Sequence, residues 1–348
     1  MIKLTGLYIH VPFCRQKFLY CNFYSECADP ETIQLYTDAV IREMAKYRFQ
    51  DINLSTVYFG GGTPGMIGEG PLCRILESTR DIFDIKENAE VTCEVNPEKL
   101  KPDFFKSLKK SGFNRISMGM QSANEDELKI LGRRHSLNDV AQCVDICRKA
   151  GIDNISGDLI TALPYSNFQK LKKSIDFISS LDITHVSSYI LKLEEGTPLF
   201  SLSKDMDMPT DDEAGDQYLY CCEELEKRGF IQYEISNFSK PGYESRHNLI
   251  YWNCHEYIGI GPSAHSFFKG NRFYYPSSTE EFIYGADVIQ DGTGGDYEEY
   301  VMLALRLKKG ISKAEFERRF KDGGSTFSTL LKNSQKCPKE YVNISQDT

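Results

Sequence analysis

Two cysteines near the start of the chain, Cys14 and Cys21, have the spacing and setting of possible metal ligands. They lie seven positions apart in a loop that directly follows the apolar segment Leu7-Tyr8-Ile9. Cysteine thiolates are the usual ligands of iron–sulfur clusters, and a cubane normally takes four of them. Two thiolates alone would hold at most a damaged or transient cluster. Two ordinary buried cysteines without any metal are the alternative interpretation of this pair.

Apolar runs alternate with helical patterns through the first two thirds of the chain, and these elements must position the loop. A strand followed by a helix, repeated, is typical of parallel βαβ units. We predict an α/β fold in which six parallel strands form an incomplete (βα)6 barrel. The predicted strands lie near residues 5–10, 55–59, 90–95, 114–119, 154–160 and 184–190, and the helices near 31–48, 70–82, 101–111, 137–150 and 167–181.

Glycines and polar residues occur where several of these predicted strands end. Gly60-Gly61-Gly62-Thr63 follows the second strand, and Glu94, Gln121 and Asp158 lie near the ends of the next three. Active sites of such barrels lie at the carboxyl ends of the strands, and consecutive glycines let backbone approach a ligand closely. We therefore expect these residues and Cys14 at one rim. A solvated loop carboxylate is the alternative for Glu94.

A second concentration of chemistry lies at His247, Asn248, Tyr251 and Trp252, which form an H-N-x-x-Y-W pattern. It offers one imidazole that could ligate iron and flat aromatic rings that could stack on a macrocycle. The alternative is a hydrated loop with a hydrogen-bonded histidine. Arg133 likewise has two interpretations, a helix-end cation near the helix dipole or a partner for a bound carboxylate.

The composition restricts the class of protein. The 348 residues carry a net charge of −9 without a basic run, which argues against a dedicated nucleic-acid surface. No apolar run approaches the roughly 18 residues of a transmembrane span, and no signal peptide is recognisable. Eleven scattered cysteines are typical of free thiols in a reducing cytoplasm.

The stretch from Tyr8 to Ser25, together with these motifs, resembles the radical S-adenosylmethionine (SAM) superfamily. It is most similar to the oxygen-independent coproporphyrinogen III oxidase family. The resemblance implies a C-x3-C-x2-C loop for a 4Fe-4S cluster, whose middle position is Phe18 in this chain. The nearest substitute thiol is Cys27. The resemblance also implies a TIM-like barrel and a set of SAM-binding residues, namely Tyr8, Gly61, Gly62, Thr63, Glu94, Gln121, Arg133 and Asp158.

Within that family the chain resembles the HemW-like branch of heme chaperones. Phe23 stands where the oxidases tend to carry a further cysteine, and no extension precedes the first strand. The branch links the H-N-x-x-Y-W motif to heme. It implies a chaperone that binds heme and transfers it to hemoproteins, respiratory ones among them. A coproporphyrinogen III oxidase that uses a SAM-derived radical and a pseudoenzyme without a cluster are the alternatives.

Three segments are expected from this resemblance. Residues 1–200 would form the barrel core, 201–295 would close the barrel with a glycine turn at 259–265, and 296–348 would form a truncated C-terminal helical domain. We expect the chain to fray beyond about residue 323. The protein is expected to be cytoplasmic and a monomer or a weak dimer.

Overall fold

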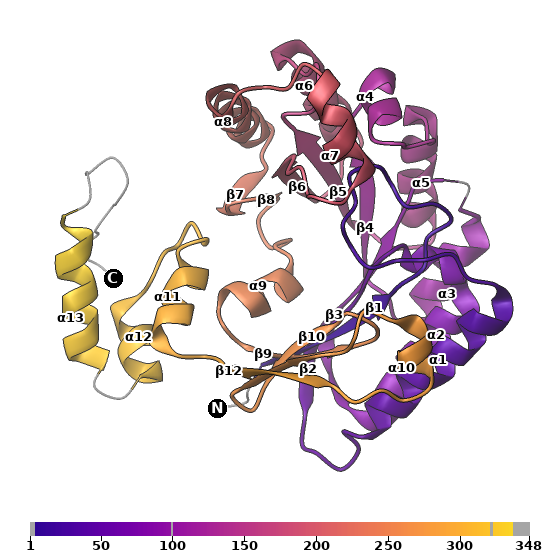
Figure 1. Cartoon of the computed structure of the whole chain (residues 1–348), viewed down its shortest axis with the longest axis vertical. Coiled ribbons are helices and arrows are strands. Elements are labelled where there is room, and N and C mark those ends of the chain that lie inside the picture. Colours follow the sequence, from indigo (N-terminus) through magenta and orange to yellow (C-terminus); the bar gives the residue numbers. More distant parts are fainter. Residues whose placement is uncertain (1–3, 99, 321–322, 337–348) are drawn as a thin grey trace.

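The computed structural model describes residues 4–98, 100–320 and 323–336. Its described part contains one mixed sheet with the strand order β12-β11-β10-β9-β1-β2-β3-β4-β5-β6-β8-β7 (Figure 1). The strands are β1 (Thr5–Val11), β2 (Asn53–Gly61), β3 (Asp84–Val95), β4 (Arg115–Gln121), β5 (Asn154–Thr161), β6 (His185–Ile190), β7 (Ile231–Glu234), β8 (Asn237–Ser239), β9 (Glu256–Ile260), β10 (His265–Phe268), β11 (Asn271–Tyr274) and β12 (Ile289–Thr293).

Strands β1 to β6 are parallel and pair in chain order, which confirms the predicted α/β sheet. The order is open, since β7 and β12 are edges, so the sheet is a partial barrel. The prediction of six parallel strands was one short, because β9 pairs in parallel with the free edge of β1, with Leu7 opposite Ile258. The glycine turn expected at 259–265 connects β9 to the antiparallel β10.

Helices that connect the parallel strands cover the outer face of the curved sheet, whereas α9 lies within its opening (Figure 1). Strand β1 is buried along most of its length, and its Leu7, Ile9 and Val11 belong to the hydrophobic core. They alternate with Tyr8 and His10, which line a cavity, so the two faces of this strand differ in polarity. The helices before the C-terminal segment are α1 (Pro30–Ala45), α2 (Glu69–Ile82), α3 (Pro102–Ser111), α4 (Glu125–Ile130), α5 (Leu137–Lys149), α6 (Phe168–Ser180), α7 (Pro198–Leu202), α8 (Asp211–Lys227), α9 (Arg246–Trp252) and α10 (Thr279–Ile283).

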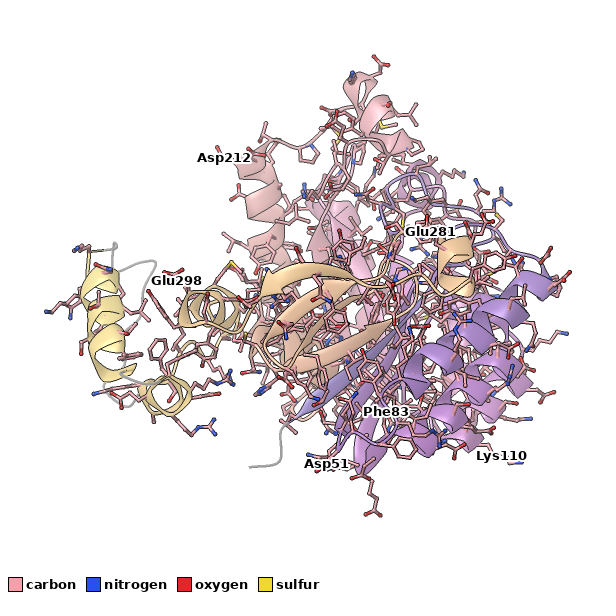
Figure 2. The ribbon with its side chains drawn as sticks, turned by 60° about the horizontal axis from the view of Figure 1, so that its bottom comes forward. Asp51, Phe83, Lys110, Asp212, Glu281 and Glu298 are labelled. Atoms are coloured by element: carbon pink, nitrogen blue, oxygen red, sulfur yellow. The ribbon has the colours of Figure 1, made fainter. Side chains whose placement is uncertain are left out.

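Three further helices, α11 (Tyr297–Ala304), α12 (Lys313–Arg319) and α13 (Gly323–Ser334), form a separate small cluster around Tyr300 and Phe316. Figure 2 shows Glu298 of α11 on the opposite side of the sheet from Lys110 and Glu281. The expectation of fraying beyond 323 was wrong as far as Ser334, because α13 is helical, and residues 337–348 lie outside the described residues. The proposed domain boundaries stay predictions. Within the described ranges no helix is long and apolar enough to cross a membrane.

Candidate functional site

A cavity of about 620 Å³ opens at the carboxyl ends of the parallel strands, and we call it the cysteine-loop cavity. The structure brings both cysteines of the loop and most of the predicted SAM residues to this one rim. Tyr8 is the exception, because it lines two neighbouring cavities instead. The predicted residues that line the cysteine-loop cavity are Cys14, Phe18, Cys21, Gly61, Gly62, Thr63, Glu94, Gln121, Arg133 and Asp158.

The glycine turn after β2 is hydrogen-bonded to the cysteine loop. The amide of Gly62 donates to the Val11 carbonyl at 2.8 Å, and that of Thr63 donates to the Phe13 carbonyl at 2.9 Å. A side chain has no room here, since a Cβ on Gly62 would lie 2.7 Å from the Phe13 oxygen. Gly61 has a φ of +108°, which favours glycine. The glycines therefore fix the distance between the turn and the loop.

The two thiols of the loop both face the cavity. Cys14 is buried, and its Sγ lies 3.5 Å from the Thr63 hydroxyl. Burial raises the pKa of the Cys21 thiol, the Phe23 amide opposes that shift, and the neighbouring Cys14 adds to it. Cys27 does not line the cavity, and its exposed thiol donates to the carbonyl of Arg15. It is therefore not a third donor in this conformation.

Phe18, at the middle position of the loop, packs against the cation predicted to bind a carboxylate. The guanidinium carbon of Arg133 lies 3.7 Å from the centre of the Phe18 ring. Arg133 also donates to Asn96 Oδ1 at 2.6 Å and to the Tyr20 hydroxyl at 2.5 Å. Its side chain is 8% exposed and has no carboxylate within ion-pair distance among the described residues. The cavity thus holds a buried cation that forms no ion pair with any residue the structure describes.

Two carboxyls face this cation across the cavity, and burial perturbs both. Burial raises the pKa of Glu94 to about 7, although the Tyr58 hydroxyl donates to its Oε1 at 2.7 Å. The Gly61 amide donates to the other oxygen of Glu94 at 3.2 Å. Burial also raises the pKa of Asp158. Near neutral pH Glu94 can therefore gain or lose a proton in response to a bound charge.

Two residues near the rim have left-handed backbone conformations. Gln121, at the end of β4, has a φ of +69°, and Ala162, which follows β5, has a φ of +54°. Such angles are uncommon for residues other than glycine and cluster at functional sites. Ala162 therefore carries a steric cost that a glycine at this position would avoid.

An inner cavity of about 200 Å³ lies next to the cysteine-loop cavity and shares Glu94, Ser117, Asp158 and Tyr189 with it. Arg115 lines this inner cavity, is 2% exposed, and has no hydrogen-bond partner for its Nε among the described residues. The inner cavity is therefore polar and positively charged at one wall.

The H-N-x-x-Y-W residues lie on α9 and divide between the inner cavity and a third one. His247 and Asn248 line the inner cavity, Trp252 lines the third, and Tyr251 lines both. His247 is 1% exposed, and its Nδ1 and Nε2 lie 2.8 Å from the hydroxyls of Thr56 and Tyr251 respectively. Burial lowers its pKa to about 3, so the ring is neutral. Both of its nitrogens are engaged, so His247 does not offer a ligand atom in this conformation.

The third cavity, which we call the aromatic cavity, measures about 570 Å³ and lies between α9, β10 and α11. It shares Asn22 and Phe23 with the cysteine-loop cavity and Tyr8 and Tyr251 with the inner cavity. The three cavities therefore adjoin one another. Aromatic and imidazole side chains dominate the lining, including Phe23, Tyr24, Tyr251, Trp252, Tyr257, Phe267, His10, His255 and His265.

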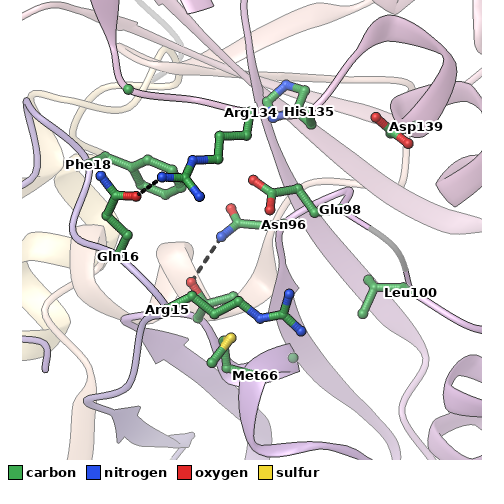
Figure 3. Close-up of a pocket in the computed structure, with 13 residues that line it drawn as sticks. Arg15, Gln16, Phe18, Met66, Asn96, Glu98, Leu100, Arg134, His135 and Asp139 are labelled. Carbon is green, nitrogen blue, oxygen red and sulfur yellow. Dashed lines mark hydrogen bonds between the residues drawn. The ribbon is translucent and has the colours of Figure 1, made fainter. Parts of the chain in front are cut away.

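A fourth, smaller cavity of about 300 Å³ shares Phe18, Thr63 and Asn96 with the cysteine-loop cavity (Figure 3). Here Arg134 donates to Gln16 at 2.5 Å, and Asn96 donates to the Thr63 hydroxyl at 3.0 Å. Asn96 therefore connects the glycine turn to Arg133. No role for Asn96 was predicted from the sequence, although its position directly after β3 was an available signal.

The donors at the cysteine loop do not match a cubane cluster. Such a cluster in this loop needs three thiolates, and the loop presents two thiols and a phenyl ring, which donates nothing to iron. Within the described ranges no group of three His, Cys, Asp or Glu residues is placed to hold a metal ion.

Comparisons with known proteins agree with the resemblance of the sequence. Residues 8–178 match the radical SAM superfamily. The heme chaperone HemW of Lactococcus lactis is 34% identical over 329 residues, which cover 92% of this chain and 86% of that protein. HemW of Bacillus subtilis is 32% identical over 344 residues, covering 95% and 91% of the two chains.

A vertebrate protein and a solved structure extend the comparison. The mitochondrial radical S-adenosyl methionine domain-containing protein 1 of Danio rerio is 33% identical over 333 residues, covering 90% of this chain and 75% of that one. The structure of coproporphyrinogen III oxidase (HemN) from Escherichia coli aligns with a TM-score of 0.81 at 18% identity, covering 96% and 82% of the two chains. That likeness shows the fold.

Proposed function

The chain belongs to the HemW family of the radical SAM superfamily, and we propose that it binds heme and transfers it to acceptor hemoproteins. The observation that carries this proposal is the 34% identity to the Lactococcus lactis heme chaperone over 86% of that protein's length. The aromatic cavity supports it, since its flat side chains and imidazoles suit a porphyrin and its iron. The cytoplasmic location and the identity of the acceptors stay predictions.

SAM is the proposed cofactor of the cysteine-loop cavity, and the polar residues there fit its methionine end. The amides of the glycine turn already donate hydrogen bonds within the protein. The groups of this turn that could bind the ammonium group of SAM are therefore its carbonyl oxygens. The buried Arg133 would pair with the carboxylate, and ionised Glu94 and Asp158 favour a cationic ligand. When bound with a cluster, SAM supplies radical chemistry in this superfamily.

We further propose that Phe18 impairs cluster binding. A third thiolate is missing, and Cys27 is directed away from the cavity. SAM binding should then be residual and weak, because the iron chelation that anchors its amino acid end is lost, and metal–ligand bonds contribute much free energy. Heme transfer without SAM cleavage is the resulting activity. The oxidase alternative has only the fold in its favour, since the HemN structure is 18% identical.

The test is a heme-transfer assay with the full chain. The heme-loaded protein is mixed with an apo-hemoprotein, and the absorption bands of both are followed. We expect the acceptor spectrum to appear faster than it does from heme-loaded serum albumin at the same concentration, which sets the rate of passive exchange. Transfer no faster than from albumin would contradict a chaperone role.

A further inference from the structure

The aromatic cavity has the size and walls that a heme-binding site needs. Its volume of about 570 Å³ lies within the range of roughly 300–1,000 Å³ that small-molecule sites occupy. Tyr251, Trp252, Tyr257 and Phe267 supply flat apolar walls. Phe23, at the boundary with the cysteine-loop cavity, is 67% exposed, so its ring is available to cover a ligand.

Two of the possible iron ligands around α9 are already occupied. His247 has both ring nitrogens within 2.8 Å of hydroxyls. His10 is similarly engaged, with Nδ1 3.0 Å from the Tyr8 hydroxyl and Nε2 3.0 Å from the Tyr24 carbonyl. Either ring would have to break a buried hydrogen bond to bind iron, which costs free energy.

Cys254 also lines the aromatic cavity but is a poor donor. Burial raises the pKa of its thiol to about 11, and the neighbouring Glu299 adds to the shift. The thiol is therefore protonated at neutral pH, whereas iron is bound by the thiolate. Cys254 can ligate iron only after it loses a proton in a buried setting.

Two imidazoles remain, those of His255 and His265. Burial, with Arg319 next in size, lowers the pKa of His255 to about 4; Glu315 opposes the shift, and Lys309 and Arg318 add to it. The cationic surroundings of His255 disfavour a ferric ion. The ring of His265 is exposed, stacks on Tyr274 with centroids 4.8 Å apart, and has no hydrogen bond to a residue that the structure describes. Stacking fixes the plane of this ring and leaves its nitrogens accessible.

We propose that heme binds in the aromatic cavity with the imidazole of His265 as its iron ligand. This assignment rests on the proposed heme-chaperone function and names its site. His247, the histidine of the H-N-x-x-Y-W motif, is then a positioning residue that joins β2 to α9 through Thr56 and holds Tyr251 between the inner and aromatic cavities. Trp252, the only tryptophan of the chain, would lie in contact with the macrocycle.

The experiment titrates the full-length protein, without any iron–sulfur reconstitution, with ferric heme. The Soret band reports the iron ligand, and quenching of Trp252 fluorescence reports occupancy. The wild type should bind one heme with an imidazole-type spectrum. His265→Ala should lose that spectrum and bind at least about tenfold more weakly, and added free imidazole should restore the band. Tenfold corresponds to about 1.4 kcal/mol.

Three comparison variants make the test specific. His255→Ala and His247→Gln should keep the wild-type Soret band, and Phe23→Ala should weaken binding without shifting it. A His265→Ala protein with unchanged band and affinity overturns the ligand assignment, as does loss of the band in His247→Gln or His255→Ala alone. A wild type that binds no heme at all overturns the proposed function together with the site.

Discussion

The cysteine-loop cavity and the aromatic cavity are neighbours that share Asn22 and Phe23. They differ in their possible metal ligands, which are incomplete in the first cavity and accessible in the second. At the cysteine loop the polar surroundings are complete, while the position of the third thiolate holds Phe18, whose ring covers Arg133. In the aromatic cavity the imidazole of His265 is accessible. The cysteine-loop cavity thus has two of its three thiols, and the aromatic cavity offers an imidazole, so heme binding can be separate from cluster binding.

The largest expected effect comes from returning a thiol to the loop by Phe18→Cys. After anaerobic reconstitution the variant should hold about four irons per chain, because three thiolates then face the cavity, whereas the protein as written should hold well under one cluster. Iron and sulfide analysis measures this, with 5′-deoxyadenosine formation as a second readout. Phe18→Ser is the matched control, since it removes the ring without adding a donor.

Either of two outcomes would contradict the claim that Phe18 alone prevents cluster binding in the cysteine-loop cavity. A full cluster in the Phe18 protein would mean that a ligand from elsewhere completes the site. A Phe18→Cys protein that still lacks a cluster would mean that the loop differs from a functional one in more than this position.

The second largest effect is expected on SAM affinity when Arg133, the buried cation of the cysteine-loop cavity, is removed. Arg133→Leu should weaken SAM binding about 10- to 100-fold, because hydrogen bonds to charged groups contribute about 1.5–3 kcal/mol. Isothermal titration calorimetry measures the affinity. Arg134→Leu is the control, since this neighbouring arginine is exposed and does not line the same cavity. Equal losses in the two variants would show that Arg133 has no specific role in binding.

The third prediction concerns the pH dependence of stability. The pKa of Glu94 is about 7 in the folded protein against its usual 4.5, so the folded state binds the proton more tightly. The stabilisation from this proton is complete below pH 4.5 and is lost as the pH rises through 7. Between those values wild type should lose about 2 kcal/mol relative to Glu94→Gln, measured by urea unfolding. Parallel pH profiles for the two proteins would contradict the desolvation of the Glu94 carboxyl.

The smallest effect is expected at Ala162, whose φ of +54° lies in the left-handed region. Ala162→Gly should stabilise the protein by about 0.5–1 kcal/mol, because glycine adopts this conformation without the steric cost of a Cβ. The melting temperature reports the change. Ala214→Gly, within helix α8, should be destabilising by a similar amount, so the same substitution has opposite signs at the two positions.

Local patterns predicted the parallel strands and the rim, because alternating strands and helices bring consecutive strand ends together. They could not predict that β9 pairs with β1, since Ile258 and Leu7 are far apart in the chain. The contact of Phe18 with Arg133 could not be predicted either, because it depends on how the loop folds back over the strand ends.

The H-N-x-x-Y-W motif was interpreted as one unit, whereas its residues line two cavities, and the helical spacing of the motif could have indicated this. His247 and Tyr251 are four residues apart and therefore share a face of α9, where they are hydrogen-bonded. Trp252 lies one position further round the helix and lines a different cavity. His265 ends the glycine turn at 259–265 that the sequence did indicate, but its place near α9 depends on the pairing of β9 with β10.

The most direct test of whether heme binding is independent of the cluster is a comparison of two heme affinities. One is that of the protein with Phe18, and the other is that of Phe18→Cys after cluster reconstitution. Both are titrated anaerobically with ferric heme, with Trp252 fluorescence and the Soret band followed together. We predict one heme per chain, an imidazole-type spectrum and the same dissociation constant in both proteins. Heme binding that appears only in the reconstituted variant would contradict this account, because the aromatic cavity would then depend on the cluster.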